Sequence, residues 1–594
     1  MEAAAAIVNV ERIQQAFRVI GTLMLTAYLL PRQAIVKDFD EYDFIIVGAG
    51  SAGSVIADRL SEVSHFNVLV IEAGGDPPYE SLVPSLFDFL PRTKYDWNFT
   101  SFENETIRKG FKTNFYNTTC AKMLGGGSSI NYLYYVRGCP NDYDSWANIF
   151  VDKTWSYAGV LPYFIKSERL ENTEILNSPY RSYHGTTGFL GVTRENRLNI
   201  DKYLQAFGEL GNDILLDVNG DQCLGFSRSF YTIARGLRQT TAITNLGANR
   251  ERPNLHVLKN TFVTQILIDE NNNAIGVKAI IDDNKEITIK ARQEVIISAG
   301  ALNTPKLLML SGIGQKSQLE KMKIKLKSDL PVGLNLQDHP FIMLPIKLEK
   351  PQDEIPPNNP FEYPFPTFVG YVTLDKLKSS ADYQATHFLI TNNSVELLSL
   401  CVSSGYKDNI CRNLYEATKD RKLMFSMLTL LHPKSRGQVL LRSSDPRDSP
   451  LVDLGILSDE RDIDDFTSYI EDYIRIINTT YFKSINSELV DLKVSECIEF
   501  KFGSKDYWRC YVKNMPTTMY HYSGTAAMGS VVDSRLRVFG INRLRVADAS
   551  VMPLVIGGNT NAAVIMIGEK LADMVKEEYY NREYSFPFTW NYFY

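Results

Sequence analysis

The chain has 594 residues, more than one hydrophobic core usually supports, so we expect more than one domain. Its 44% hydrophobic and 22% charged residues are typical of a globular protein and exclude a disordered chain. The 63 lysines and arginines and 69 aspartates and glutamates give a net charge of -6, which offers no electrostatic attraction to DNA or RNA.

The N-terminal segment, residues 1–39, contains an apolar run from Val19 to Leu30 with the length of the hydrophobic part of a secretory signal. The run is too short to cross a bilayer comfortably, and no other stretch predicts a stable membrane span. A signal would make the protein secreted. If the segment is instead a helix packed on the first domain, the protein is intracellular.

The cysteines and glycosylation sequons favour the secreted alternative. No CxxC pair occurs, so the sequence predicts no zinc or other metal site. Cys401 with Cys411, and Cys497 with Cys510, are close enough in sequence to close short loops as disulfides in an oxidising compartment. Five Asn-x-Ser/Thr sequons are typical of a glycoprotein, and they begin at Asn98, Asn104, Asn117, Asn392 and Asn478.

A dinucleotide-binding pattern begins near residue 42. A strand of the buried type is followed by the motif Gly48-x-Gly50-x-x-Gly53, a helix-compatible run and a second strand that ends at Glu72. The strands are predicted at residues 44–47 and 67–71, and the helix at residues 54–60. Each of these parts is weak evidence alone, but their order indicates a βαβ unit that binds a dinucleotide.

Each residue of this motif has a physical role. Gly48 permits the tight turn, Gly50 lets the backbone approach a pyrophosphate, and Gly53 lets the helix pack closely on the strand. The helix N-terminus then faces the phosphates, and the Glu72 carboxylate can accept hydrogen bonds from both ribose hydroxyls. The position of the motif, with several hundred residues after it, favours FAD over a free nicotinamide cofactor.

Several further motifs resemble those of the glucose-methanol-choline (GMC) oxidoreductases. Residues 124–138 resemble the first family signature and residues 298–314 the second. Residues 331–339, 520–529 and 558–562 resemble later landmarks in the same order, so the resemblance runs from about residue 40 to 575. Within the family, the chain resembles the insect group of ecdysone oxidases and glucose dehydrogenases.

The resemblance implies two catalytic residues. His521 matches the family's catalytic histidine, which accepts the proton of the substrate hydroxyl while a hydride leaves the adjacent carbon for flavin N5. Asn559 matches a position that holds histidine or asparagine. An amide is no general base, but it can hydrogen-bond the substrate oxygen and hold the alcohol against His521.

The resemblance also implies a set of cofactor contacts. Residues 124–131 would wrap the pyrophosphate and ribityl chain, and residues 131–134 would run beneath the flavin ring. Val263, on a strand predicted at residues 262–268, would meet the adenine. The complete set implied for FAD is Gly48, Gly50, Ser51, Ala52, Gly53, Glu72, Ala73, Leu124, Gly126, Ser128, Asn131, Tyr132, Leu133, Tyr134, Val263, Asp548, Ala549, Thr560 and Asn561. The family's covalent attachment uses a histidine where this chain has Ile130, so FAD is expected to be non-covalent.

The fold implied by the resemblance combines an α/β, Rossmann-like FAD-binding domain, discontinuous in sequence, with a substrate-binding domain built on an antiparallel sheet. The FAD-binding domain is expected to take residues 40–165, 236–345 and 520–575. The substrate-binding domain would take residues 166–235 and 346–519, which leaves residues 576–594 as a C-terminal tail.

The resemblance predicts oxidation of an alcohol to a carbonyl, with oxygen or a quinone as acceptor. Tyrosines around both motifs favour a bulky, largely apolar alcohol, and the expected reaction is oxidation of an ecdysteroid 3-hydroxyl. Glucose or another alcohol is the alternative substrate. A non-redox lyase and a binding glycoprotein without catalysis remain open, while the sequence leaves the oligomeric state undetermined.

Overall fold

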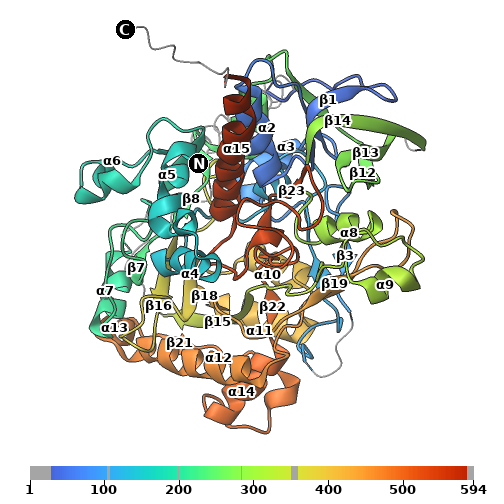
Figure 1. Ribbon diagram of the computed structural model, residues 1–594. Coiled ribbons are helices and arrows are strands. Elements are labelled where there is room, and N and C mark those ends of the chain that lie inside the picture. The colour runs from blue at the N-terminus through green and yellow to red at the C-terminus, as the bar shows by residue number, and fades with distance from the viewer. Residues whose placement is uncertain (1–28, 103–106, 198–199, 282–283, 350–358, 585–594) are drawn as a thin grey trace, which may run out of the picture.

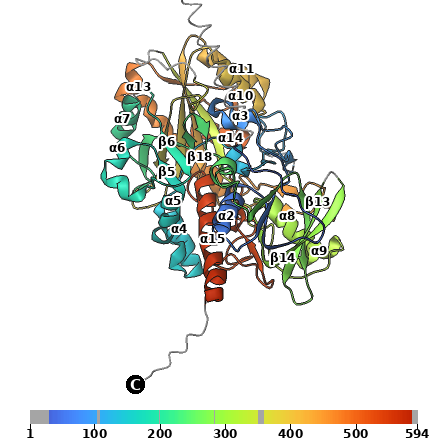
Figure 2. The same ribbon diagram turned by 90° about the horizontal axis from the view of Figure 1, so that it is seen from above.

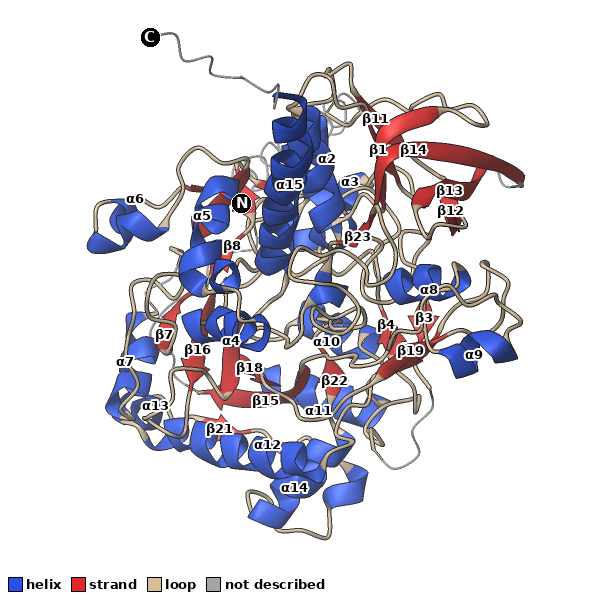
Figure 3. Ribbon diagram, viewed as in Figure 1, coloured by secondary structure: helices blue, strands red, loops and turns tan. Residues whose placement is uncertain are grey.

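The computed structural model describes residues 29–102, 107–197, 200–281, 284–349 and 359–584. Its described part contains two seven-stranded sheets with helices around them (Figure 1). Figure 3 shows the strands of these sheets in two separate regions of the molecule. The prediction of an α/β protein with an added antiparallel sheet is confirmed.

The first sheet is built around the dinucleotide-binding unit. Its order is β11-β2-β1-β14-β13-β12, with β23 also beside β14. The strands β11, β2, β1, β14 and β23 pair in parallel, whereas β12, β13 and β14 pair antiparallel. The bounds are β1 (Glu41–Val47), β2 (Val68–Ile71), β11 (Leu255–Leu258), β12 (Phe262–Ile268), β13 (Ala274–Ile281), β14 (Lys285–Ile297) and β23 (Leu544–Val546).

Two helices from distant parts of the sequence cover this sheet side by side. Helix α2 (Ser51–Ser61) follows β1, and α15 (Asn561–Tyr584) ends the described chain. They lie against each other in both views (Figures 1 and 2). Gly568 of α15 faces α2, because a Cβ there would stand 2.9 Å from the Ala52 carbonyl oxygen. This packing brings the first residues of α15 to the glycine-rich turn.

The second sheet is antiparallel and has the order β21-β15-β18-β17-β16-β7, with β22 also beside β15. Its alternating residues face the pocket described below. Helices α12 and α14 lie along its outer side (Figure 1). The bounds are β7 (Gly225–Arg228), β15 (Pro340–Leu348), β16 (Thr367–Val372), β17 (Tyr383–Ile390), β18 (Lys422–Leu430), β21 (Glu488–Leu489), β22 (Thr517–Thr518), α12 (Glu460–Tyr473) and α14 (Lys505–Asn514).

Shorter elements connect the two sheets. The helices are α3 (Tyr79–Leu82), α4 (Pro140–Phe150), α5 (Tyr157–Ser167), α6 (Thr173–Leu176), α7 (Asp201–Glu209), α8 (Asn303–Leu310), α9 (Lys316–Lys321), α10 (Val395–Ser403), α11 (Asp408–Thr418) and α13 (Thr480–Ser484). The strands are β3 (Phe99–Thr100), β4 (Asn117–Thr118), β5 (Glu168–Leu170), β6 (Leu190–Arg194), β8 (Phe230–Tyr231), β9 (Ile233–Ala234), β10 (Leu237–Arg238), β19 (Gln438–Leu440) and β20 (Leu451–Asp453).

The strands of the first sheet all come from the three segments assigned to the FAD-binding domain. Strand β15 crosses the boundary placed at residue 345, and it pairs with β18 from Phe341 to Leu348. The whole of β15 therefore belongs to the second sheet, whereas the predicted boundary divided its residues between two domains. The division into domains otherwise stays a prediction.

Both cysteine pairs that are close in sequence are bonded, Cys401 to Cys411 and Cys497 to Cys510. A third disulfide joins Cys139 to Cys223 across 84 residues, and sequence spacing gave no sign of it. Cys120 is free and half-buried. The apolar run of residues 19–30 lies almost wholly outside the described residues, as does the sequon at Asn104. Among the described helices none combines the length and the apolar character of a membrane span.

Candidate active site

The glycine-rich turn forms one wall of a deep pocket between the two sheets. Gly48 has a φ of +100°, and a Cβ there would stand 2.4 Å from the Ser298 carbonyl oxygen. A Cβ on Gly53 would stand 1.9 Å from the Gly48 carbonyl oxygen, which confirms that this position needs glycine for packing. A Cβ on Gly50 would have its nearest neighbour, the Gly126 Cα, at 3.8 Å, so there is open space in which a ligand can approach the backbone.

The next strand of the unit contributes Glu72, which lines the same pocket. Its carboxylate accepts hydrogen bonds from the Ala49 N–H at 3.0 Å and the Gly74 N–H at 2.9 Å. These bonds fix the carboxylate at the end of β2. Burial raises the pKa of Glu72 to about 7, against the effect of the two backbone donors.

A second glycine-rich segment lies on the first. Gly126 has a φ of +50°, and a Cβ there would stand 2.6 Å from the Gly50 Cα. The first residue of α15 joins the same wall, because the Ser51 hydroxyl donates to the Asn561 side-chain oxygen at 2.8 Å. The start of α2 has no side-chain cap, so its first N–H groups are available to a ligand.

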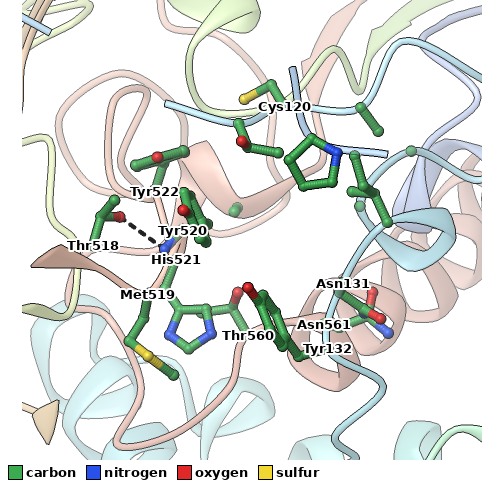
Figure 4. Close-up of a pocket in the computed structure, with 18 of the residues that line it drawn as sticks. Cys120, Asn131, Tyr132, Thr518, Met519, Tyr520, His521, Tyr522, Thr560 and Asn561 are labelled. Atoms are coloured by element: carbon green, nitrogen blue, oxygen red, sulfur yellow. Dashed lines mark hydrogen bonds between the residues drawn. The ribbon is translucent and has the colours of Figure 1, made fainter. Parts of the chain in front are cut away.

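Most of the predicted site residues meet in this pocket. It is lined by the predicted residues Gly48, Gly50, Ser51, Ala52, Glu72, Ala73, Gly126, Asn131, Tyr132, Tyr134, Val263, His521, Asp548, Ala549, Asn559, Thr560 and Asn561. Figure 4 shows several of them, among them His521, Tyr132 and Asn561, which come from distant parts of the chain.

Four predicted residues lie behind the wall rather than on it: Gly53, Leu124, Ser128 and Leu133. Leu124 and Leu133 are fully buried in the core. The Ser128 hydroxyl turns back to donate to the Gly125 carbonyl oxygen at 2.6 Å, so it holds the loop's shape. That these four residues contact the cofactor stays a prediction, and beside them Asn131 lines the pocket.

The catalytic candidates are neighbours. The Asn559 side-chain nitrogen lies 3.3 Å from His521 Nε2. His521 Nδ1 lies 2.9 Å from His339 Nδ1, and His339 Nε2 lies 2.9 Å from the Leu431 carbonyl oxygen. Burial lowers the pKa of His521 to about 3, and burial together with His521 lowers the pKa of His339 well below its usual value.

These contacts determine which ring nitrogens carry protons. A carbonyl oxygen only accepts, so His339 Nε2 donates to Leu431. Neutral His339 then accepts at Nδ1, and the donor to it is His521 Nδ1. The remaining lone pair of His521 is at Nε2, on the side of Asn559. His521 is therefore held neutral, with its basic nitrogen toward the pocket that it lines.

Two further side chains hold His521 and Asn559 in place, and the sequence did not single out either of them. Asp338 accepts hydrogen bonds from the backbone N–H of His521 at 2.9 Å and from that of His339 at 2.8 Å. Gln384 of β17 donates to the Asn559 side-chain oxygen at 3.3 Å, which turns the amide NH2 group of Asn559 toward His521. The signal for Asp338 and His339 was their place in segment 331–339, which resembles a family landmark, whereas Gln384 carries no local signal.

The opposite wall of the pocket is mainly apolar. Alternating residues of β15, β17 and β18 face it, as the two-residue period of a strand requires. They are Phe341, Met343, Thr386, Phe388, Ile390, Phe425 and Met427, of which only Thr386 is polar. Among the lining residues the charged side chains Glu72, Lys306 and Asp548 all belong to the dinucleotide half. The pocket thus has a polar half for a cofactor and an apolar half beside the base.

The polar half fits FAD. Its glycines leave open space at Gly50, an uncapped helix start faces a phosphate position, and a fixed carboxylate stands where the ribose is expected. A neutral histidine base next to such a site defines the class of flavin-dependent oxidoreductases that act on CH–OH donors.

Comparison with known proteins gives the family. Models of the GMC oxidoreductases match residues 42–341 and 433–568, and the chain belongs to this family. An ecdysone oxidase of Bombyx mori is 40% identical over 576 residues, which cover 94% of this chain and 85% of that protein. A glucose dehydrogenase [FAD, quinone] of Drosophila pseudoobscura pseudoobscura is 35% identical, with 93% of this chain and 89% of that protein covered.

The solved structures agree. A formate oxidase of Aspergillus oryzae, studied for the modification of its FAD, matches with a TM-score of 0.77 and 25% identity. The match covers 92% of this chain and all of the other chain. The chain is thus an FAD-dependent oxidoreductase of the GMC family that acts on CH–OH donors.

Proposed function

We propose that this enzyme oxidises a ring hydroxyl of an ecdysteroid, at its 3-position, to the ketone. The observation that carries the proposal is the apolar wall formed by β15, β17 and β18 beside His521. Each 100 Å² or so of apolar substrate surface buried there stabilises the complex by about 2.5 kcal/mol. The similarity to the ecdysone oxidase of Bombyx mori supports the same substrate class.

The roles of the chain's own residues follow from the proton positions. FAD, when bound, supplies a hydride acceptor for the carbon that bears the hydroxyl. His521 accepts the hydroxyl proton at Nε2, because its Nδ1 proton is already donated to His339. The resulting positive charge is shared along the hydrogen bond to His339. The low pKa of His521 keeps the base free of a proton at neutral pH.

Asn559 positions the alcohol. Its amine points toward His521 Nε2 because Gln384 holds its oxygen. The same amine can donate to the substrate oxygen, which directs the hydroxyl hydrogen toward the base. This donor also stabilises the negative charge that develops on the oxygen as the proton leaves.

A sugar would be a poorer ligand for this wall. Each buried hydroxyl without a partner costs about 1–3 kcal/mol, and among the residues of β15, β17 and β18 that line the pocket only Thr386 offers a hydroxyl. Glucose remains the alternative substrate because the Drosophila relative is a glucose dehydrogenase.

The test is anaerobic mixing of the enzyme with ecdysone, glucose, and simple aromatic and aliphatic alcohols, with loss of the yellow flavin colour as the readout. We expect ecdysone to bleach the flavin fastest at equal concentration, and faster bleaching by glucose would contradict the substrate. Product without bleaching would indicate a lyase, and neither would indicate a binding protein. Reoxidation by oxygen or by a quinone dye then identifies the acceptor.

We also propose that the protein is secreted and glycosylated. Three disulfides support an oxidising compartment, and the sequon residues Asn392 and Asn478 are exposed. Expression of the full chain in insect cells should deliver it to the medium with a mass that glycosidase treatment reduces. Retention inside the cells without glycans would contradict the proposal.

A further inference from the structure

A buried arginine stands behind the cofactor wall. Arg238, in β10, is 1% exposed. Its Nε donates to the Ser81 carbonyl oxygen at 2.6 Å, and Nη1 donates to both the backbone and the side-chain oxygen of Asn131 at 2.7 Å each. Nη2 has no hydrogen-bond partner. Asn131 itself lines the pocket, so the guanidinium is one residue away from the cofactor.

The charge of Arg238 has no acidic partner in the described part of the chain. Two other buried arginines are paired, Arg137 with Glu168 at 2.9 Å and Arg545 with Glu294 at 2.7 Å, whereas buried Arg108 lies over the rings of Phe111 and Tyr116. Arg238 meets only neutral oxygens, and burial lowers its pKa to about 9, which still leaves it charged at neutral pH. A buried charge of this kind is costly unless an opposite charge lies nearby.

The pocket in front of Arg238 is where such a charge would be placed. The residues that follow Arg238 contact the glycine-rich loop that precedes Asn131, because the Thr240 hydroxyl lies 2.5 Å from the Ser129 hydroxyl. Among the residues that line the pocket, Lys306 is the single lysine or arginine, and its amine donates to the Pro446 carbonyl oxygen at 2.7 Å. The lining itself thus supplies little positive charge for a diphosphate.

We propose that Arg238 is a positioning residue for FAD that acts in two ways without touching the cofactor. It fixes Asn131 and the loop before it by its forked donors, and it supplies the positive charge that balances the cofactor's diphosphate. A charge in the low-dielectric interior acts across one layer of chain, and salt screens it far less than a surface charge. The inference concerns the cofactor and is independent of the substrate proposed above.

The test compares FAD release from purified holoenzymes, followed as the rise of flavin fluorescence after dilution. Arg238→Gln keeps hydrogen-bond donors but loses the charge, and Arg238→Lys keeps the charge but loses the fork. We expect at least tenfold faster release from Arg238→Gln and an intermediate rate from Arg238→Lys. The matched control is Arg292→Gln, which makes the same change of charge on the half-exposed Arg292 of β14.

A second readout isolates the diphosphate. When FAD is added back to enzyme that has released it, ADP should compete for the site much less well in Arg238→Gln than in the wild type. Adenosine, which has no phosphates, should compete equally in both. Unchanged release and unchanged ADP competition in Arg238→Gln would overturn the proposal. The counter-charge role would be overturned if Arg238→Gln and Arg238→Lys released FAD equally fast. It would also be overturned if Arg238→Gln weakened competition by ADP and by adenosine to the same extent. If Arg238→Gln does not fold, Arg238→Lys releasing FAD at the wild-type rate overturns the positioning role.

Discussion

Replacement of His339 by phenylalanine should slow substrate oxidation without loss of FAD. His339 is fully buried and is the acceptor for His521 Nδ1–H. Phenylalanine keeps a ring of similar size but leaves that donor unpaired, at a cost of about 1–3 kcal/mol. Moving the His521 proton to Nε2 relieves this cost and removes the basic lone pair from the substrate side. At about 1.4 kcal/mol per tenfold in rate, we expect anaerobic flavin bleaching to slow by about 5- to 150-fold.

The assay is stopped-flow bleaching at saturating alcohol, so that the rate reports the oxidation step. Apparent substrate affinity should change little, because His339 does not line the pocket. His387→Phe is the matched control: His387 is another fully buried histidine, on β17, that stacks on Phe207 and has no contact with His521. Wild-type bleaching by His339→Phe, or equal slowing in both variants, would refute the assignment of the proton positions.

Three further predictions concern the same pocket and the core. Asn559→Ala should weaken apparent substrate affinity and slow bleaching less than loss of His521 does; a variant with wild-type kinetics would show that Asn559 does not hold the alcohol. His387→Phe should stabilise the protein, most of all in acid. Burial lowers the pKa of His387 to about 3. The unfolded histidine titrates near 6.5, so the wild type loses stability as pH falls from about 6.5 toward 3, by up to about 1.4 kcal/mol per pH unit. Urea unfolding at pH 7 and pH 5 measures the free energy of unfolding of both proteins. If the difference between His387→Phe and the wild type is no larger at pH 5 than at pH 7, the prediction is contradicted. Trichloroacetic acid should leave the flavin in the supernatant, because Ile130 offers no nucleophile for a covalent bond; a yellow pellet would refute non-covalent binding.

Local patterns predicted the dinucleotide unit well. The strand expected at residues 44–47 is the second half of β1, and the strand expected at residues 67–71 is β2, which begins one residue later, at Val68. The helix expected at residues 54–60 is α2, which begins three residues earlier, at Ser51. These elements were readable because apolar periodicity and glycine positions are local properties. The family motifs then brought His521, Asn559 and most cofactor residues to one pocket.

Contacts between distant segments were not readable. The disulfide from Cys139 to Cys223 depends on how the chain returns after 84 residues. His339 meets His521 only because β15 and β22 pair side by side. The hydroxyl of Ser128, a residue expected among the cofactor contacts, donates to the Gly125 carbonyl oxygen of its own turn. Such outcomes depend on tertiary packing, which no local pattern reports.

The most direct test of the mechanism is anaerobic flavin bleaching by ecdysone in His521→Ala, compared with the wild type at equal FAD content. His521 is expected to act as the base, and general-base catalysis contributes about 10²–10⁴-fold. We predict that the variant retains its FAD and bleaches slower by a factor in that range. Bleaching of His521→Ala at the wild-type rate would show that another group takes the proton.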